Sequence, residues 1–374
     1  MSRLNGFLNG VRVLDLSRHL PGPLATLFLA DMGAEILKIE PPAGDELRVM
    51  GPTGPAGRSV YFDAVNAGKT TRRLDLTRPD DRLAFLDVVK TIDIVIESFR
   101  PGVMSRLGVG YETLQATNPG LIYCSLNGFG HGGPLAQRAA HDINYLSLAG
   151  TLFHNDGGGS PFFDPPVADC AGALFAALTI VGALHGRARD GKGCHIDLAL
   201  ADVAMPLQIF HVAEFVHSRM PPQPNATLLN GGAACYRVYR TSDGRHVSLG
   251  ALEPKFWRAF CTAAIRPDWE GRHEDPLPQT QLVEEVATMF RGLTLAQCQQ
   301  RFGNADCCFA PVLDLAEALE SPHVRARGLV HRTSAGELQA LFPAVIDGER
   351  PMPRASIRAF DMTADRRPSS EDIA

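Results

Sequence analysis

The N-terminal half of the chain alternates between strand and helix patterns, and this alternation constrains the fold more than any other feature. Short apolar runs typical of β-strands stand at 11–16, 35–40, 91–99 and 120–129. Helix-length segments separate them, and the one at 24–32 has helical spacing of its apolar residues. Strands separated in this way pair in parallel through right-handed crossovers. The pattern predicts an α/β fold with a Rossmann-like open parallel sheet, which binds ligands at the carboxyl ends of its strands.

The C-terminal half carries a different pattern. The composition shifts to Pro and Asn before residue 230, which is typical of a linker. YRVYRT and HVSLGAL then form two alternating strands joined at Ser242-Asp243-Gly244, and a mostly helical stretch follows. We therefore expect a large domain over 1–205, a linker over 206–230, a smaller α+β domain over 231–315, and a return linker with a C-terminal segment on the large domain over 316–374.

Charge and cysteine content exclude several classes of protein. The net charge is −5 and basic residues are interspersed with acidic ones, which argues against nucleic-acid and membrane partners. The longest uncharged apolar run, 170–184, is shorter than the roughly 20 residues of a bilayer span and indicates a buried helix. The N-terminus lacks the apolar region of a signal peptide. The eight cysteines are scattered without metal-ligand spacing, so we expect reduced thiols in a cytoplasmic protein, with no metal and no redox cofactor.

Two ionisable residues stand at the edges of apolar runs. His141 precedes the run INYLSLAG, and Asp169 lies between PPVA and a long apolar helix. A carboxylate in apolar surroundings has a raised pKa, and an imidazole titrates near neutral pH, so the two together suit proton transfer. From the residues alone a second interpretation stays open, in which Asp169 caps a helix and His141 is a polar residue at a loop–helix junction.

Long ordered motifs resemble one enzyme family. AAHDINYLSLAG (139–150) and PPVADCAGALFAALTIVGAL (165–184) are similar to the acid/base segments of the alpha-methylacyl-CoA racemases, a branch of the family III CoA-transferase superfamily. The resemblance covers nearly the whole chain. Further matching segments are 11–45, 93–134, 187–203, 236–257 and 307–328.

The resemblance implies a site for the CoA part of an acyl-CoA thioester substrate, with no separate cofactor. At strand ends, Arg and Lys are otherwise most often solvated surface residues. In the family such positions grip the adenine, ribose and phosphates, and Lys38 would face the phosphates. The residues that match are Arg18, His19, Lys38, Leu74, Ser98, Phe99, Arg100 and Arg106.

The resemblance also implies an isomerase of lipid metabolism that racemises 2-methylacyl-CoA thioesters. His141 and Asp169 would stand on opposite faces of the α-carbon, and Glu253 would hydrogen-bond the catalytic imidazole. We expect the backbone N–H groups of Asp169 and Cys170 to stabilise the enolate, because a helix N-terminus supplies oriented donors. The family forms interlocked homodimers, and the segments at about 205–230 and 315–345 would thread the two chains through each other.

The alternative is a family III CoA-transferase, in which the aspartate matching Asp169 is a nucleophile. Two features favour the racemase. The histidine of HDINY, His141, is typical of racemases. The segment NGGAACY (230–236) also lacks the run of four glycines that many such transferases carry. A CoA-thioester sensor without activity is a third reading, against which the retained His141, Asp169 and Glu253 argue.

Overall fold

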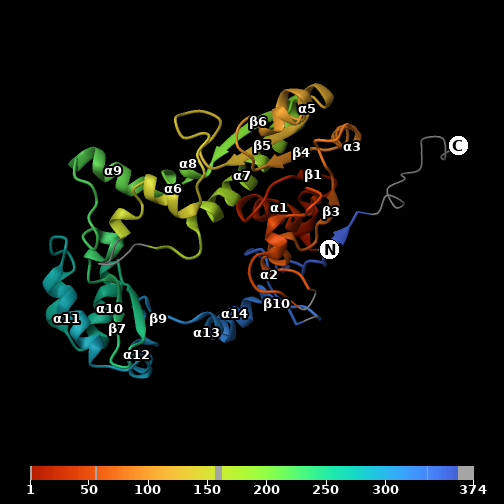
Figure 1. The fold of residues 1–374 in the computed structure, drawn as a ribbon. Helices are drawn as coiled ribbons and strands as arrows, with labels where there is room; N and C mark the ends of the chain where they lie inside the picture. The colour runs from red at the N-terminus through yellow and green to blue at the C-terminus, as the bar shows by residue number, and fades with distance from the viewer. Residues whose placement is uncertain (1, 55–56, 156–161, 335, 361–374) are drawn as a thin grey trace. The chain divides into compact units, whose positions relative to one another are not determined.

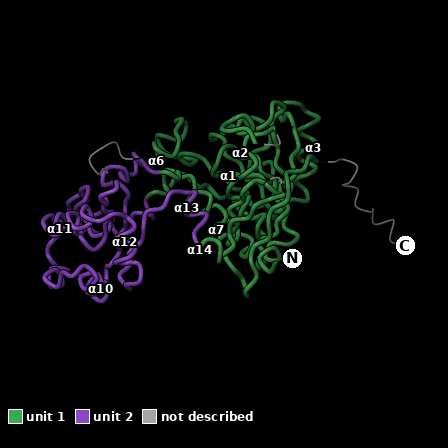
Figure 2. The backbone as a smooth tube through the Cα atoms, turned by 90° about the horizontal axis from the view of Figure 1, so that it is seen from below, with its two compact units in different colours: residues 1–145, 164–204, 322–374 green, residues 146–163, 205–321 purple. Residues whose placement is uncertain are grey.

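The computed structural model describes residues 2–54, 57–155, 162–334 and 336–360, and it divides into two compact units. Unit 1 comprises residues 1–145, 164–204 and 322–374, and unit 2 comprises 146–163 and 205–321 (Figure 2). Unit 2 is thus formed by two segments that are inserted into the sequence of unit 1. The segment 146–163, which we expected in the large domain, belongs to unit 2. The end of the C-terminal segment, 361–374, lies outside the described residues.

Unit 1 is built on a seven-stranded sheet in the order β12-β3-β2-β1-β4-β5-β6, and all neighbouring strands are parallel. This confirms the predicted open parallel sheet (Figure 1). The central strands are buried on both faces, which explains their nearly continuous apolar sequences. The strands are β1 (Arg12–Asp15), β2 (Glu35–Glu40), β3 (Thr70–Arg73), β4 (Ile94–Glu97), β5 (Ile122–Asn127), β6 (Cys194–Ala199) and β12 (Arg358–Ala359).

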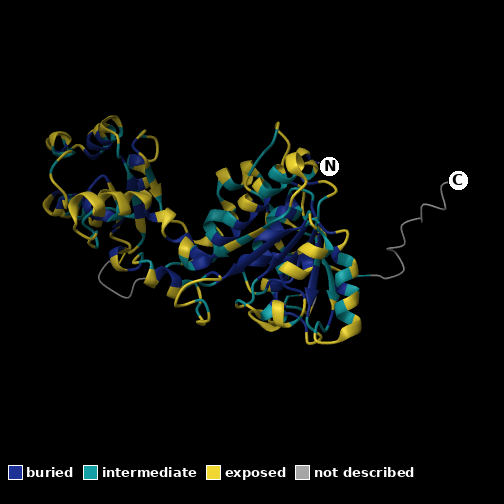
Figure 3. Ribbon diagram, turned by 90° about the horizontal axis from the view of Figure 1, so that it is seen from above, coloured by how far each residue is buried: buried dark blue, intermediate teal, exposed yellow. Residues whose placement is uncertain are grey.

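Helices cover this sheet, whose strands are the most buried part of the unit (Figure 3). Helix α1 packs against α7, and α7 also contacts β5 and β6. Helices α3 and α5 pack together, and they contribute Phe85 and Leu114 to a core that includes Leu14 and Val95 of the strands. The helices of unit 1 are η1 (Arg3–Gly6), α1 (Pro21–Asp31), η2 (Glu46–Val49), α2 (Val60–Asn66), α3 (Pro79–Val89), α4 (Val103–Arg106), α5 (Tyr111–Thr117), α7 (Val167–Asp190), α8 (Leu200–Val203) and α14 (Pro322–Arg327).

Helix α7 is longer than the apolar run that predicted it. It has 24 residues and ends at Gly191, which adopts a left-handed conformation that suits glycine. By length and composition alone it could cross a membrane, and it is the one such helix in the described parts of the chain. The apolar core helix of a globular domain passes the same test, and α7 packs against α1 and the sheet.

Unit 2 contains the predicted hairpin and the helices that follow it. Strands β7 (Tyr236–Arg240) and β8 (His246–Gly250) pair antiparallel, and β9 (Phe309–Pro311) adds to β8. The turn between β7 and β8 contains Gly244 at a φ of 77°. The core holds Trp257, Phe260 and Phe290. The helices are η3 (Phe153–Asn155), η4 (Pro206–Gln208), α9 (Ile209–Ser218), η5 (Leu228–Gly232), α10 (Pro254–Ala264), η6 (Pro267–Arg272), α11 (Thr280–Arg291), α12 (Leu295–Phe302) and α13 (Leu315–Glu320).

The described residues form three further elements. Helix α6 (Asp142–Leu148) begins at the end of one stretch of unit 1 and continues into unit 2. Strands β10 (Val330–Arg332) and β11 (Leu338–Ala340) form a two-stranded antiparallel sheet within unit 1. The segment expected to be a linker, 206–230, contains the helix α9.

Candidate active site

The strand order of unit 1 brings the loops after β1 and β4 together. The chain proceeds from β1 to one side of the sheet and from β4 to the other, and ligands bind at such a switch point in this type of fold. The backbone N–H of Arg18 donates to Ser98 Oγ at 2.9 Å, which joins the two loops. The Arg18 guanidinium lies 5.1 Å from the centroid of the Phe99 ring. The structure therefore places Arg18, Ser98 and Phe99, all predicted from the sequence, in one crevice.

Lys38 lies beneath this crevice and does not face into it. Its ammonium is 2.9 Å from the Asp45 carboxylate and donates to the Ser17 carbonyl at 2.8 Å. The side chain is 1% exposed, because β2 is an inner strand. This corrects the expectation that Lys38 meets the nucleotide's phosphates: its ammonium is enclosed and already bound. It supports the loop that carries Arg18 instead.

A second buried ion pair anchors the same loop. Lys69 Nζ lies 3.1 Å from Asp15 Oδ2, and both side chains are fully buried. The Asp15 carboxylate also accepts hydrogen bonds from Ser17 and Thr26. Burial raises the pKa of Asp15, but the charges of Lys38 and Lys69, with the hydrogen bonds from Ser17 and Thr26, together outweigh burial and lower the net pKa. Burial lowers the pKa of Lys69 to about 8 despite its carboxylate partner. The end of β1 is thus held by charges that water does not screen.

Replacing Lys38 with methionine is expected to destabilise the protein strongly. Lys38 Nζ, 2.9 Å away, is the counter-charge of Asp45 Oδ2, which has no other polar partner among the described residues. Breaking a buried pair by removing one partner costs about 3–5 kcal/mol. Urea unfolding would measure this loss. The double variant Lys38→Met/Asp45→Asn should lose less than Lys38→Met alone, because it leaves no uncompensated charge. Equal losses would show that the pair is not coupled.

Two adjoining pockets open from the switch point. The first is mostly apolar and is lined by Leu74 and Phe99, together with Arg18. Arg18 also lines the second pocket, with Ser98 and Arg100. Arg106, by contrast, is exposed at the end of α4 and lines neither pocket. Seven of the eight residues predicted to bind CoA therefore lie at this switch point or directly beneath it. They are Arg18, His19, Lys38, Leu74, Ser98, Phe99 and Arg100.

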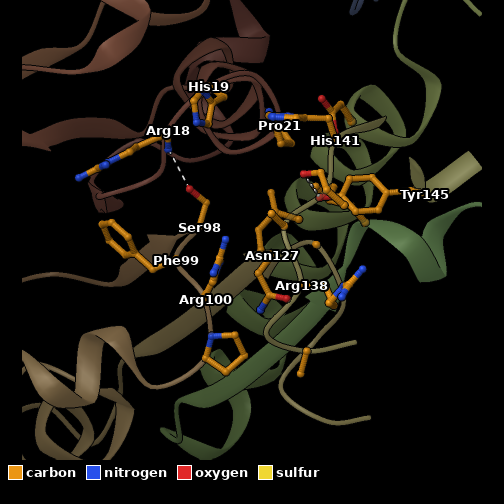
Figure 4. A pocket seen from close by; sticks show the side chains of 18 residues that line it. Arg18, His19, Pro21, Ser98, Phe99, Arg100, Asn127, Arg138, His141 and Tyr145 are labelled. Carbon is orange, nitrogen blue, oxygen red and sulfur yellow. Dashed lines mark hydrogen bonds between the residues drawn. The ribbon is translucent and has the colours of Figure 1, made fainter. Parts of the chain in front are cut away.

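The second pocket contains both candidate acid/base residues. His141 stands at the start of α6 and lines the cavity (Figure 4). Asp169, in the first turn of α7, also lines it. The imidazole of His19 reaches the same cavity, and its ring centroid lies 6.2 Å from that of His141 in an edge-to-face arrangement. His19 has a positive φ of 61°, which is uncommon for a residue with a side chain. Such strained residues cluster at functional sites.

Short polar contacts join the starts of α6 and α7. The backbone N–H of His141 donates to Asn144 Oδ1 at 3.0 Å, and that of Asp169 donates to Asp142 Oδ1 at 3.0 Å. Asn144 therefore fixes the loop of His141, and Asp142 ties α7 to α6. The Cys170 N–H donates to the Pro166 carbonyl. This corrects the expected enolate-stabilising site, because both proposed backbone donors already have acceptors within the chain.

Asp169 has the electrostatic character expected of an acid/base group. Burial raises the pKa of its carboxyl to about 7, and the neighbouring Asp142 carboxylate adds to the shift. The group is therefore poised to exist in both protonation states at neutral pH. Burial raises the pKa of Cys170, and the carboxyls of Asp169 and Asp142 add to the shift, so this thiol is not an activated nucleophile.

Three polar residues of this pocket were not singled out from the sequence. Asn127, at the end of β5, and Arg138, in the loop before His141, both line the cavity. Tyr145 is buried and also lines the cavity, and its hydroxyl donates to the Ala140 carbonyl. The LNG sequence at the end of a strand (126–128) is the signal that could have drawn attention to Asn127.

Glu253 lies in unit 2, at the N-terminal cap of α10, where its side chain makes no capping hydrogen bond. It is exposed. Its expected hydrogen bond to His141 therefore stays a prediction. Among the described residues no group of three or more His, Cys, Asp or Glu side chains is arranged to hold a metal ion.

The family model for CoA-transferase family III matches residues 8–355. The chain belongs to this family. An acetyl-CoA:oxalate CoA-transferase of Acetobacter aceti is 42% identical over 92% of this chain and 90% of its own length. The human alpha-methylacyl-CoA racemase is 33% identical over 86% of this chain and 81% of its own length. Among solved structures, a CAIB/BAIF family protein from Brucella suis superposes with a TM-score of 0.81 at 27% identity, covering 93% of this chain and 95% of that one.

The protein is thus an enzyme of the family III CoA-transferase superfamily with the α/β fold of its relatives. An acyl-CoA substrate is consistent with this membership. The similar proteins include both a racemase and CoA-transferases, so the family alone leaves two reactions to weigh.

Proposed function

We propose that the protein racemises 2-methylacyl-CoA thioesters by moving the proton on the α-carbon. One observation carries this proposal: His141 shares its pocket with Asp169, whose pKa is raised to about 7. A carboxyl group with this pKa can both give and take a proton at neutral pH. A carboxylate that acts as a nucleophile requires a low pKa instead, because a raised pKa reduces the share of the ionised form, which is the form that attacks at neutral pH.

In the proposed reaction, His141 and Asp169 act on opposite faces of the α-carbon. One group removes the proton, and the electron pair of the C–H bond forms the planar enolate. The other group then delivers its own proton to the opposite face, which inverts the configuration. The enzyme returns to its starting state by exchanging protons with water. The reverse reaction uses the same two groups in exchanged roles.

The pockets at the switch point would hold the substrate. We propose that the apolar pocket of Leu74 and Phe99 takes the adenine, and that Arg18 and Arg100 contact phosphate or pantetheine groups. Arginine suits this task because its guanidinium makes charge-assisted hydrogen bonds to phosphate oxygens. Arg106 is exposed on α4, so it would contact only the part of CoA that lies outside the pockets. CoA is carried as part of the substrate, and we propose no further cofactor.

CoA transfer is the second candidate, and the 42% identity with an acetyl-CoA:oxalate CoA-transferase favours it. In this reaction Asp169 would attack the thioester and form an anhydride and then an aspartyl-CoA thioester. His141 would have no chemical step. The two candidates therefore differ in what they require of His141.

Deuterium uptake at the α-carbon tests the proposal. The enzyme is incubated with a 2-methylacyl-CoA in D₂O, without free carboxylic acids, and the thioester is analysed by mass spectrometry. Uptake with loss of stereochemical purity is the expected result. No uptake, together with movement of CoA onto an added carboxylic acid, would replace the racemase by the transferase.

We further propose that the chain acts as an interlocked homodimer in the cytoplasm. Apolar side chains on α7 and α9 stand uncovered: Leu178 is 66% exposed, and Phe210 is 69% exposed on a helix that has no buried residue. A second copy would cover such surfaces. All eight cysteines are free, which fits a reducing compartment.

The dimer predicts a solution mass twice that of one chain, measured by light scattering during size-exclusion chromatography. It also offers a route by which Glu253 of one protomer contacts His141 of the other. An active enzyme whose mass remains that of one chain at assay concentration would contradict the dimer.

A further inference from the structure

An enolate needs hydrogen-bond donors at its oxygen, and the two N–H groups expected to supply them at the start of α7 already have acceptors. The N–H groups of Asp169 and Cys170 are bound to Asp142 and Pro166. Removing an α-proton moves charge from the C–H bond onto the thioester oxygen, and donors fixed in advance at this oxygen contribute strongly to catalysis. Another donor in the pocket must therefore meet the oxygen.

Asn127 carries such a donor. It is the last residue of β5, it lines the pocket of His141 and Asp169, and only 5% of it is exposed (Figure 4). Its Oδ1 accepts hydrogen bonds from the backbone N–H groups of Gly130 at 2.7 Å and Phe129 at 3.2 Å. These bonds fix the amide plane and identify which atom is the oxygen.

The Nδ2 group of Asn127 has no hydrogen-bond partner among the described residues and is shielded from solvent. Leaving a buried donor unpaired costs about 1–3 kcal/mol, so its presence calls for an acceptor supplied by something else. A bound ligand is the source to expect in a pocket. The side chains of Arg18, Arg100 and Arg138 also offer donors, but Arg100 and Arg138 are exposed, whereas the Asn127 amide is buried and held by two hydrogen bonds.

We propose that Asn127 Nδ2 donates a hydrogen bond to the carbonyl oxygen of the bound thioester and stabilises the enolate. This inference rests on the proposed racemisation. No proton passes from Asn127: the C–H electron pair becomes the new C=C bond, the carbonyl π pair moves onto the oxygen, and the proton goes to His141 or Asp169. The hydrogen bond from Nδ2 strengthens as the oxygen gains charge, so it lowers the barrier more than it tightens substrate binding.

Asn127→Asp tests the role with little change of shape. The aspartate keeps an oxygen acceptor for Phe129 and Gly130, but it places an oxygen where the amide donor stood. We expect kcat for racemisation to fall by about 10²–10³-fold, as loss of one such donor does elsewhere, with KM changed by less than about threefold. Asn127→Ser, which keeps a hydroxyl able to accept and donate, should recover part of kcat. CoA affinity should match the wild type in both variants.

Two results would overturn the proposal. One is a kcat of Asn127→Asp close to that of the wild type. The other is a parallel loss of kcat and CoA affinity in both variants, which would mean that Asn127 only shapes the loop at 128–130. Wild-type α-deuterium uptake is measured alongside. Its absence would reject the racemase itself, whereas wild-type uptake with unaffected variants would reject Asn127 alone.

Discussion

Asp169→Asn is expected to reduce α-proton exchange by about 10³-fold or more, within the range that a positioned acid/base group contributes. The amide has nearly the same shape as the carboxyl group and cannot take or give the proton. Exchange would be followed by mass spectrometry in D₂O, and inversion by chiral separation of the hydrolysed acid. Both should be lost together, because inversion needs both groups.

The Asn variant also provides its own folding control. The Asp169 carboxyl is buried near Asp142, so its ionisation costs free energy in the folded state. A group whose pKa is raised on folding destabilises the protein as pH rises above its unfolded value. Asp169→Asn should therefore be at least as stable as the wild type at neutral pH. Inactivity with a lowered unfolding midpoint would point to misfolding and not to lost chemistry.

The raised pKa of Asp169 also determines how the rate of racemisation depends on pH. Racemisation requires one proton shared between Asp169 and His141, because the fully protonated pair has no base and the fully deprotonated pair has no acid. We expect a bell-shaped profile of kcat/KM centred near neutral pH, identical in both directions, since Asp169 titrates at about 7. A nucleophilic carboxylate would instead give a rate that rises through about 7 and then stays level.

His141→Gln has the second largest expected effect and separates the two reactions. In the racemase, exchange should fall by about 10²–10⁴-fold, because glutamine cannot transfer protons. In the transferase, CoA transfer should persist, since Asp169 alone forms the covalent intermediates. The assay measures α-deuterium uptake and CoA transfer to an added carboxylic acid on the same preparation.

His131→Gln is the matched control, because it makes the same change at an exposed histidine that does not line the pocket. Its activity should equal that of the wild type. Retained exchange in His141→Gln would remove His141 from the chemistry.

Local patterns predicted the sheet well because each central strand of unit 1 has its own apolar run. The position of the site at the loops after β1 and β4 could also be predicted, because the carboxyl ends of parallel strands lie at the same edge of a sheet. The expectation that Lys38 meets the phosphates was wrong because the alternation of polar and apolar residues in EILKIE does not reveal that the strand is covered on both faces. Its partner Asp45 lies in a separate turn, and no periodic pattern connects the two residues.

The details of the site depend on contacts between residues far apart in the sequence. Asp142 accepts the N–H of Asp169 across 27 positions, which no local motif encodes. Whether the Nδ2 group of Asn127 stays unpaired depends on how the loop at 128–130 turns back over the side chain and binds Oδ1. Residue type could indicate acid/base chemistry, but which donors remain free is decided only by tertiary packing.

The position of β12 has a consequence for synthesis in the cell. This strand, at residues 358–359, pairs with β3, whose other edge pairs with β2. While the ribosome makes the chain, the edge of β3 that faces β12 therefore keeps unpaired amide and carbonyl groups until residues 358–359 have been made. An unpaired strand edge is a template for pairing with other chains. The nascent protein thus carries an edge prone to aggregation throughout the translation of unit 2, and pairing with β12 ends that exposure.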